Sequence, residues 1–152
     1  MKVGIIGASG FVGGELLRLL INHRQVELTM ATSRTYDGQF LYKIHPNLKG
    51  FTDLKFSSFD NSTVLDDCDL VFTAVPHGSS FEFMNQLTNT GVKIIDMSAD
   101  YRLDSSLSYE KWYGLAHPNP DLLKTFTFGL PEINRKSIES STYVSTPGCT
   151  AL

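Results

Sequence analysis

The sequence predicts a doubly wound α/β fold, in which helices cover both faces of a mostly parallel sheet. Three observations support this fold class. Short and almost continuously apolar runs recur along the chain, a helical pattern separates the first two of them, and a glycine-rich turn joins the first run to that helix. Apolar strands without polar alternation are typical of parallel sheets, and their alternation with helices indicates crossover connections.

The N-terminal part of the chain follows this pattern closely. Residues 2–6 form a short apolar run that favours a buried strand, and residues 11–22 carry a wide apolar face that favours a helix. A second strand is expected at residues 26–31. A third strand is expected at residues 69–75, because this apolar run stops at Pro76, which lacks the N–H that a sheet requires.

The C-terminal part continues the alternation. The pattern predicts a helix at about residues 79–90, with Gly91 as its C-terminal cap, and strands at residues 92–96 and 143–145.

Two long stretches show no regular period. Residues 34–53 and 97–131 combine glycine, proline and scattered aromatic residues. We expect both to be ordered loops over an edge of the sheet, and long ordered loops often carry function.

The composition is that of an ordinary globular domain. Hydrophobic residues make up 41% and charged residues 19% of the 152 residues, and the formal net charge is −3. This balance gives no reason to expect nucleic acid as a partner, and no apolar run approaches the ~20 residues that cross a membrane. The apolar run at the N-terminus passes into glycines, so we expect no targeting segment. Cys68 and Cys149 suit neither a disulfide framework nor a metal site, and we expect no metal and a reduced, cytoplasmic setting.

A glycine-rich turn follows the first predicted strand and opens the first helix. Gly7, Gly10 and Gly13 have the spacing G-x-x-G-x-x-G, a variant of the dinucleotide-binding fingerprint. Glycines permit the tight turn and allow backbone N–H groups to approach a pyrophosphate, which the positive end of the helix also attracts. The alternative is a tight turn without a ligand. We predict a dinucleotide site at Gly7, Ser9, Gly10, Phe11, Val12 and Gly13.

The end of the second strand indicates which dinucleotide is bound. An NAD site places Asp or Glu there to bind the ribose 2′-hydroxyl. The segment after Ala31 contains no acid, and Glu27 lies at the start of the strand, too far back to reach the ribose. A guanidinium with neighbouring hydroxyls suits a 2′-phosphate, so Ser33, Arg34 and Thr35 favour NADP over NAD. The alternative is that Arg34 is a solvated loop residue.

Cys149 follows Pro147 and Gly148, directly after the last predicted strand. If a helix begins at Cys149, its N-terminus would lower the thiol pKa and supply N–H groups for an oxyanion. A lone cysteine is more often a buried structural residue. Together with a nicotinamide site, however, this cysteine favours aldehyde and acyl-phosphate chemistry through a thioester. Cys68 lies among aspartates and is predicted to be structural.

Other polar residues are expected to have structural roles. Asp96, Asp100 and Arg102 are predicted to form a fixed polar cluster that shapes a loop, and His77, at the end of the third strand, is predicted to be a satisfied structural residue.

Several motifs, taken together, carry a family resemblance. They are residues 7–18 (GASGFVGGELLR), 96–103 (DMSADYRL), 112–114 (WYG) with 117–118 (HP), 129–132 (GLPE) and 147–149 (PGC). In this order, and over nearly the whole chain, they resemble the N-acetyl-gamma-glutamyl-phosphate reductases. Residues 32–34 and 45–50 are similar to the archaeal-type enzymes of lysine and arginine synthesis, which act on an aminoadipyl or glutamyl phosphate held by a carrier protein. The residues after Cys149 depart from the Tyr-Pro-Thr that is common in the acetylglutamyl enzymes, which favours the carrier-linked subgroup.

The resemblance implies a Rossmann-like NADP-binding domain at residues 1–146. Residues 147–152 would then begin a catalytic domain of the semialdehyde-dehydrogenase type, with the rest of that domain absent from this chain. The implied enzyme is an NADPH-dependent reductase that converts an acyl phosphate to a semialdehyde in arginine or lysine biosynthesis. The acyl phosphate is a small molecule, N-acetyl-gamma-glutamyl phosphate, or a glutamyl or aminoadipyl phosphate bound to a carrier protein.

The resemblance also assigns residue roles. It assigns Ser9, Gly10, Phe11 and Val12 to the phosphate-binding turn, Ser33, Arg34 and Thr35 to the 2′-phosphate, and Cys149 to the nucleophile. The family's acid/base histidine and substrate-binding residues fall beyond residue 152. We therefore expect residues 1–152 alone to be inactive, and the full-length enzyme to be a homo-oligomer.

Two alternatives stay open at this point. Aspartate-semialdehyde dehydrogenase shares the implied architecture, but its cysteine usually follows asparagine, whereas Cys149 follows Pro-Gly. A non-catalytic NADP-binding module that ends near residue 152 is the other alternative, and the length of the native gene product distinguishes it from an enzyme.

Overall fold

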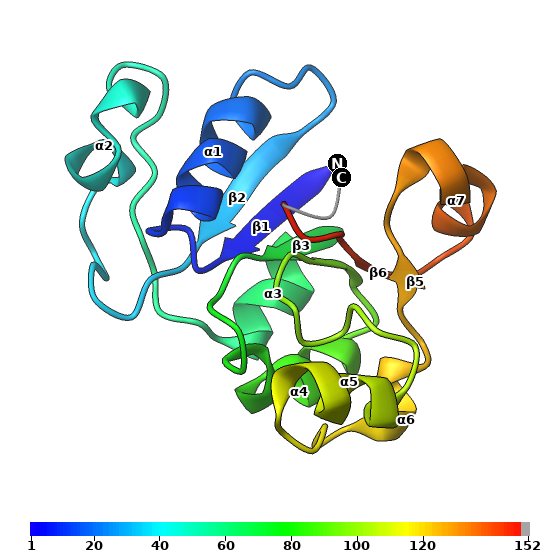
Figure 1. The fold of residues 1–152 in the computed structure, drawn as a ribbon. Helices are drawn as coiled ribbons and strands as arrows, with labels where there is room; N and C mark the ends of the chain where they lie inside the picture. Colours follow the sequence, from blue (N-terminus) through cyan, green and yellow to red (C-terminus); the bar gives the residue numbers. More distant parts are fainter. Residues whose placement is uncertain (150–152) are drawn as a thin grey trace.

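The computed structural model describes residues 1–149, apart from the side chain of Leu65. Its strands are β1 (Lys2–Ile6), β2 (Glu27–Ala31), β3 (Leu70–Thr73), β4 (Lys93–Asp96), β5 (Thr127–Phe128) and β6 (Tyr143–Ser145). They form one sheet in the order β2-β1-β3-β4-β6-β5, and every neighbouring pair is parallel. The chain winds outward from β1 to β2 and then returns to add β3 on the other side of β1. This topology confirms the predicted doubly wound α/β class (Figure 1).

Short helices surround the sheet. They are α1 (Phe11–Leu20), α2 (Leu41–Ile44), α3 (Asn61–Asp67), α4 (Met84–Thr88), α5 (Ser106–Tyr113), α6 (Pro120–Leu123) and α7 (Pro131–Glu139), with single 3-10 turns η1 (Pro46–Leu48) and η2 (Ser80–Glu82). No helix in the described part of the chain has the length and apolar character that a membrane span requires.

The sheet separates two hydrophobic cores. On one face, α1 and the excursion that contains α2 pack through Leu17 and Leu41 against Ile5 of β1. On the other face, α4 packs through Met84 against Ile94 of β4. All five side chains are completely buried, and each contributes roughly 1.5–3 kcal/mol relative to an exposed position. Both cores therefore hold the central strands, and their carboxyl ends, in fixed positions.

The predicted strands are all present, but several helices differ from expectation. The helix expected at residues 79–90 is instead the turn η2 followed by the short helix α4, with Gly91 at φ +75° after its end. The helices α3, α5, α6 and α7 lie in stretches where no apolar period predicts one. Capping groups explain two of them: Asp60 accepts a hydrogen bond from the N–H of Ser62 at the start of α3, and Ser105 accepts from Ser108 at the start of α5.

The parallel arrangement brings the carboxyl ends of all strands to one edge of the sheet. The glycine-rich turn follows β1, Arg34 lies just after β2, and Cys149 lies shortly after β6, so all three lie at this edge. Between β1 and β6 stand β3 and β4, which separates the two positions by three strand spacings, or about 14 Å. In open α/β sheets, ligands bind at this edge, near the point where the winding reverses.

Candidate functional site

The glycine-rich turn has the tight geometry that the sequence predicts. Gly7 has a φ of +82°, and a Cβ there would lie 2.5 Å from the carbonyl oxygen of Ala74. A Cβ at Gly13 would lie 2.6 Å from the Cα of Ala8. Since these are backbone atoms, which cannot move aside cheaply, both glycines are required by the packing of the turn itself.

Gly10 differs from its two neighbours in the motif. Its φ is −77°, and the nearest atom to a Cβ built there is the carbonyl oxygen of Gly7, at an ordinary 3.7 Å. Packing therefore does not require glycine at this position. Two physical reasons favour it: Gly10 is the N-cap of α1, and a glycine leaves space for an approaching ligand.

Hydrogen bonds join the turn to the end of β2. The N–H of Ala8 donates to the carbonyl of Thr32 (2.9 Å), and the N–H of Gly7 donates to the Thr32 hydroxyl (3.3 Å). The Ser33 hydroxyl donates to that of Ser9 (3.0 Å). His45, to which the sequence gives no role, donates from Nε2 to the carbonyl of Ala8 (2.9 Å). The turn and the strand end therefore form one rigid unit.

A cleft of about 610 Å³ opens beside this unit. Its lining residues are Ile6, Gly7, Ser9, Thr32, Ser33, Arg34, Thr35, Ser58, Phe59, Val75, Pro76, Ser79, Glu82, Phe83 and Gln86. Hydroxyl groups and a guanidinium line one part, and apolar side chains such as Val75 and Phe83 line another. This mixture suits an adenosine group, whose base is flat and apolar and whose ribose is polar.

The structure gathers most of the predicted dinucleotide residues around the turn. Gly7, Ser9, Ser33, Arg34 and Thr35 line the large cleft, and Ser9, Gly10 and Phe11 line a neighbouring hollow of about 280 Å³. Val12 and Gly13 line neither space, because Gly13 is buried under the turn and Val12 points outward at the start of α1.

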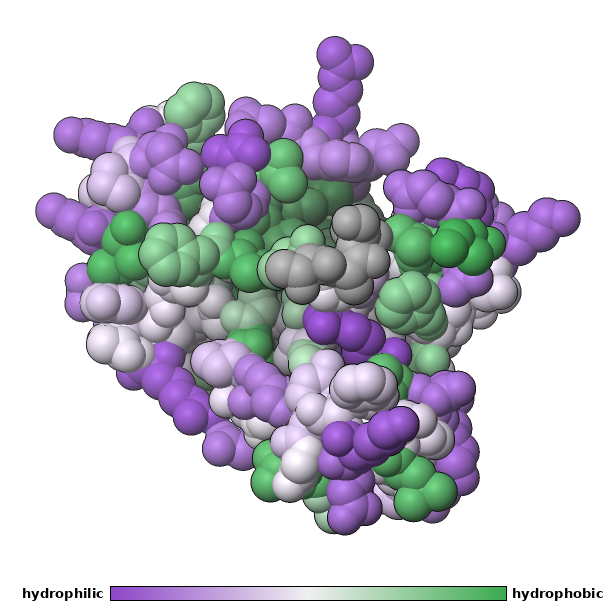
Figure 2. Space-filling model, viewed as in Figure 1, coloured by the Kyte–Doolittle hydropathy of each residue, from purple (hydrophilic) through white to green (hydrophobic). Residues whose placement is uncertain are grey.

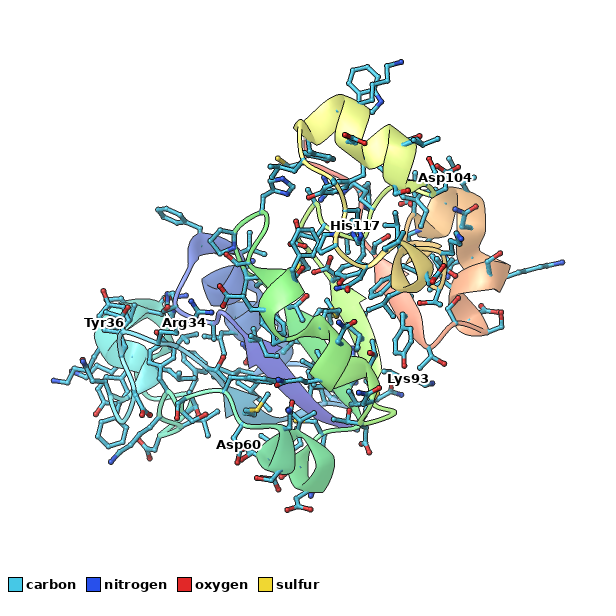
Figure 3. All side chains as sticks on the ribbon, turned by 90° about the horizontal axis from the view of Figure 1, so that it is seen from below. Arg34, Tyr36, Asp60, Lys93, Asp104 and His117 are labelled. Atoms are coloured by element: carbon cyan, nitrogen blue, oxygen red, sulfur yellow. The ribbon has the colours of Figure 1, made fainter. Side chains whose placement is uncertain are left out.

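Arg34 forms an ion pair with Glu82. Figure 3 shows Arg34 beside Tyr36, well apart from His117. Both members of the pair are mostly exposed, with 77% of the Arg34 and 61% of the Glu82 side chain accessible. Glu82 belongs to η2, after β3, and no local pattern in the sequence links it to the end of β2.

A buried polar cluster shapes the next part of the same edge. The Asp100 carboxylate is completely buried and accepts hydrogen bonds from the N–H of Gly78 (2.7 Å) and the hydroxyl of Ser80 (2.5 Å). Its Oδ1 also lies 2.8 Å from Nδ1 of His77. Asp96 accepts from the Thr73 hydroxyl (2.5 Å), and burial raises the pKa of its carboxyl group. The structure thus confirms that aspartates fix this loop and that His77 is a satisfied residue.

Arg102 connects that cluster to the chain segment before Cys149. Its Nε donates to the carbonyl of Thr146 (2.7 Å), and its Nη2 donates to that of Ser98 (3.0 Å). A Cβ at Gly148 would lie 3.0 Å from Nη1 of Arg102, so glycine allows the guanidinium to approach the backbone. Cys149 itself is exposed and free. The expected helix after Cys149 falls outside the described residues.

Within residues 1–149, no group of three His, Cys, Asp or Glu side chains is arranged to hold a metal ion.

Two apolar side chains are strongly exposed. Phe11, at the start of α1, is 98% accessible, and Ile133, on α7, is 75% accessible. Figure 2 shows two groups of hydrophobic residues on this face, one at the level of the start of α1 and one towards α7. Exposed apolar surface of this kind is typical of a face that another domain or subunit covers.

Comparison with curated proteins supports the family resemblance. The chain is 56% identical over 152 residues to a protein of Nitrosopumilus maritimus named putative LysW-L-2-aminoadipate/LysW-L-glutamate phosphate reductase, covering 100% of this chain and 44% of that protein. It is 50% identical over 149 residues to an N-acetyl-gamma-glutamyl-phosphate reductase of Archaeoglobus fulgidus, covering 98% and 43%. The chain thus spans less than half the length of these relatives.

Solved structures agree on the fold. Aspartate semialdehyde dehydrogenase from Candida albicans, solved with NADP, superposes with a TM-score of 0.64 at 14% identity, over 95% of this chain and 41% of that one. Aspartate semialdehyde dehydrogenase II from Vibrio cholerae gives 0.66 at 19% identity, over 98% and 38%. The family described as semialdehyde dehydrogenase, NAD binding domain, matches residues 2–141. The chain belongs to this family.

Proposed function

We propose that this chain supplies the NADP-binding domain and the nucleophilic cysteine of a reductase that converts an acyl phosphate to a semialdehyde. The observation that carries the proposal is the placement of the dinucleotide cleft and Cys149 on one edge of a parallel sheet. Residues 1–146 then form the cofactor domain, and residues 147–152 begin the catalytic domain. The exposure of Phe11 and Ile133 supports this division, because a second domain would cover such apolar side chains.

The residues of the cleft fit NADP. The N–H groups at the start of α1 and the open space above Gly10 suit the pyrophosphate. Ser33, Thr35 and Arg34 suit the 2′-phosphate, because hydroxyls and a guanidinium donate hydrogen bonds to its oxygens. When bound, NADPH would supply the hydride that reduces the acyl group to an aldehyde.

Cys149 provides the covalent step. Its thiolate attacks the carbonyl carbon of the acyl phosphate, the bond from that carbon to the phosphate oxygen breaks, and inorganic phosphate leaves as a thioester forms. After reduction, the tetrahedral thiohemiacetal expels the thiolate and releases the aldehyde. Arg102 fixes the backbone before Cys149 through Thr146, and so holds the sulfur in place for the attack.

The names of the relatives point to the substrate class. Carrier-linked aminoadipyl and glutamyl phosphates fit the subgroup that residues 32–34 and 45–50 resemble. Aspartyl phosphate is the second candidate, since aspartate semialdehyde dehydrogenases share the fold.

A substrate panel tests the proposed reaction. The full-length protein is supplied with NADPH and with carrier-bound glutamyl, carrier-bound aminoadipyl, N-acetylglutamyl or aspartyl phosphate. We expect aldehyde and phosphate to appear in equal amounts, with the carrier-bound substrates turned over fastest. Preference for aspartyl phosphate would support the second candidate, and no turnover of any acyl phosphate would contradict the proposal.

Replacement of Gly10 by alanine tests the dinucleotide site separately from the fold. The added methyl group meets no atom closer than 3.7 Å, and Gly10 is the N-cap of α1, where alanine is less favourable than glycine, so we expect a loss of stability of at most about 1 kcal/mol. It would occupy the space proposed for the pyrophosphate, and NADPH affinity should fall by about tenfold or more, measured by fluorescence titration. Normal affinity in the folded Gly10→Ala protein would place the pyrophosphate elsewhere.

A further inference from the structure

An acidic residue lies in the cleft where the sequence predicts a 2′-phosphate site made of Arg34 and hydroxyl groups, without an acid. Arg34, after β2, and Glu82, in η2 after β3, line the same 610 Å³ cleft, and their side chains form an ion pair. No acid follows β2 in the sequence, but the fold supplies one from η2.

The position of Glu82 is fixed by the loop that carries it. Ser80, in the same 3-10 turn, donates from its N–H (3.2 Å) and its hydroxyl (2.5 Å) to the buried Asp100. Phe83, next to Glu82, is only 7% accessible and packs in the core that contains Met84. The backbone on both sides is therefore anchored, which keeps Glu82 among the residues that line the cleft.

The charges of the pair have opposite effects on the two dinucleotides. A 2′-phosphate carries close to two negative charges, which Arg34 attracts and Glu82 repels. A 2′-hydroxyl is neutral and donates a hydrogen bond, which a carboxylate accepts well. Because the pair is mostly exposed, its own stability is small and either ligand can compete with it.

We propose that Glu82 is a specificity-determining residue that weakens NADP binding and supports NAD binding, so that the cleft accepts both dinucleotides. This inference rests on the proposed function only in placing the adenosine ribose beside Arg34. It departs from the expectation of a simple NADP site, because the acid typical of NAD sites is present on another element.

The test is the Glu82→Gln variant of the full-length protein. Equilibrium binding of NADP and of NAD is measured by calorimetry, with folding checked by circular dichroism. Removal of one negative charge from beside the proposed 2′-phosphate should tighten NADP binding by about tenfold at low salt, and the gain should shrink at high salt. NAD binding should weaken, because an amide is the poorer acceptor for the ribose hydroxyl.

Asp121→Asn is the matched control. Asp121 also forms an exposed ion pair, with Lys124 (3.3 Å), and its loss changes the net charge by the same amount outside the cleft. We expect the control to leave both affinities unchanged. If Glu82→Gln leaves the ratio of NADP affinity to NAD affinity unchanged, or weakens NADP binding, the inference is overturned while the proposed function stays intact. A wild-type protein that binds neither dinucleotide would instead overturn the proposed function, and this inference with it.

Discussion

Replacement of Cys149 by serine is expected to abolish aldehyde formation and to leave NADPH affinity within about twofold of the wild type. A serine hydroxyl stays protonated near neutral pH and is a far weaker nucleophile than a thiolate. We expect the single-turnover rate to fall by at least about a thousandfold. Binding should persist because Cys149 follows β6, three strands away from the glycine-rich turn, and does not line the cleft.

Rapid-quench single turnover with the full-length protein measures this effect, and dinucleotide fluorescence measures binding in parallel. Cys68→Ser is the matched control, because Cys68 lies before β3 at the opposite edge of the sheet. Burial raises the pKa of the Cys68 thiol, and its Sγ lies 3.7 Å from the Thr29 hydroxyl, as expected for a structural residue. Turnover that survives in Cys149→Ser but not in Cys68→Ser would reverse the assignment. Loss of NADPH binding in Cys149→Ser would count against the separation of cleft and nucleophile.

All strands except β5, which lies in the stretch expected to be a loop, could be predicted because their signal is local. Each is a short apolar run between turn residues. β1 is buried from Val3 to Ile6, as expected of a central strand, whereas buried and less buried residues alternate along β3 and β4. The glycine-rich turn could also be predicted, because the spacing of its glycines is a local signal, although the backbone that leaves no room for a side chain at Gly7 is that of Ala74, after β3.

The short helices could not be predicted from apolar periodicity. α7 has no buried residue, and α5 buries Tyr109 alone, so neither presents an apolar stripe. Their boundaries depend instead on caps and on tertiary contacts. Gly114, for example, ends α5 in the left-handed conformation, with a φ of +71°.

The contacts that define the site are mostly between residues far apart in sequence. The pairing of Arg34 with Glu82 and that of His77 with Asp100 each join segments that only the sheet brings together. The sequence shows which polar residues follow each strand. Which residue each of them contacts depends on the order of the strands in the sheet. The presence of an acid in the cleft therefore required the structure.

Replacement of Asp100 by asparagine is expected to destabilise the protein by about 2–4 kcal/mol. The carboxylate is completely buried, and both of its oxygens accept hydrogen bonds from donors: Gly78 and His77 on Oδ1, and Ser80 on Oδ2. An asparagine keeps the shape but turns one oxygen into an NH₂ group. That group would face an N–H or O–H donor and leave a buried polar group without a partner.

Urea denaturation of the full-length protein measures the loss in free energy of unfolding, with Asp104→Asn as the control. Asp104 is an exposed acid on the same loop, so its replacement should change stability by less than about 0.5 kcal/mol (Figure 3). The effect of Asp100→Asn should also reach the cleft, since Ser80 anchors the turn that carries Glu82. We expect weaker dinucleotide binding even at temperatures where the variant is folded. A stable Asp100→Asn protein with unchanged binding would mean that the loop after β3 is held by its apolar contacts alone.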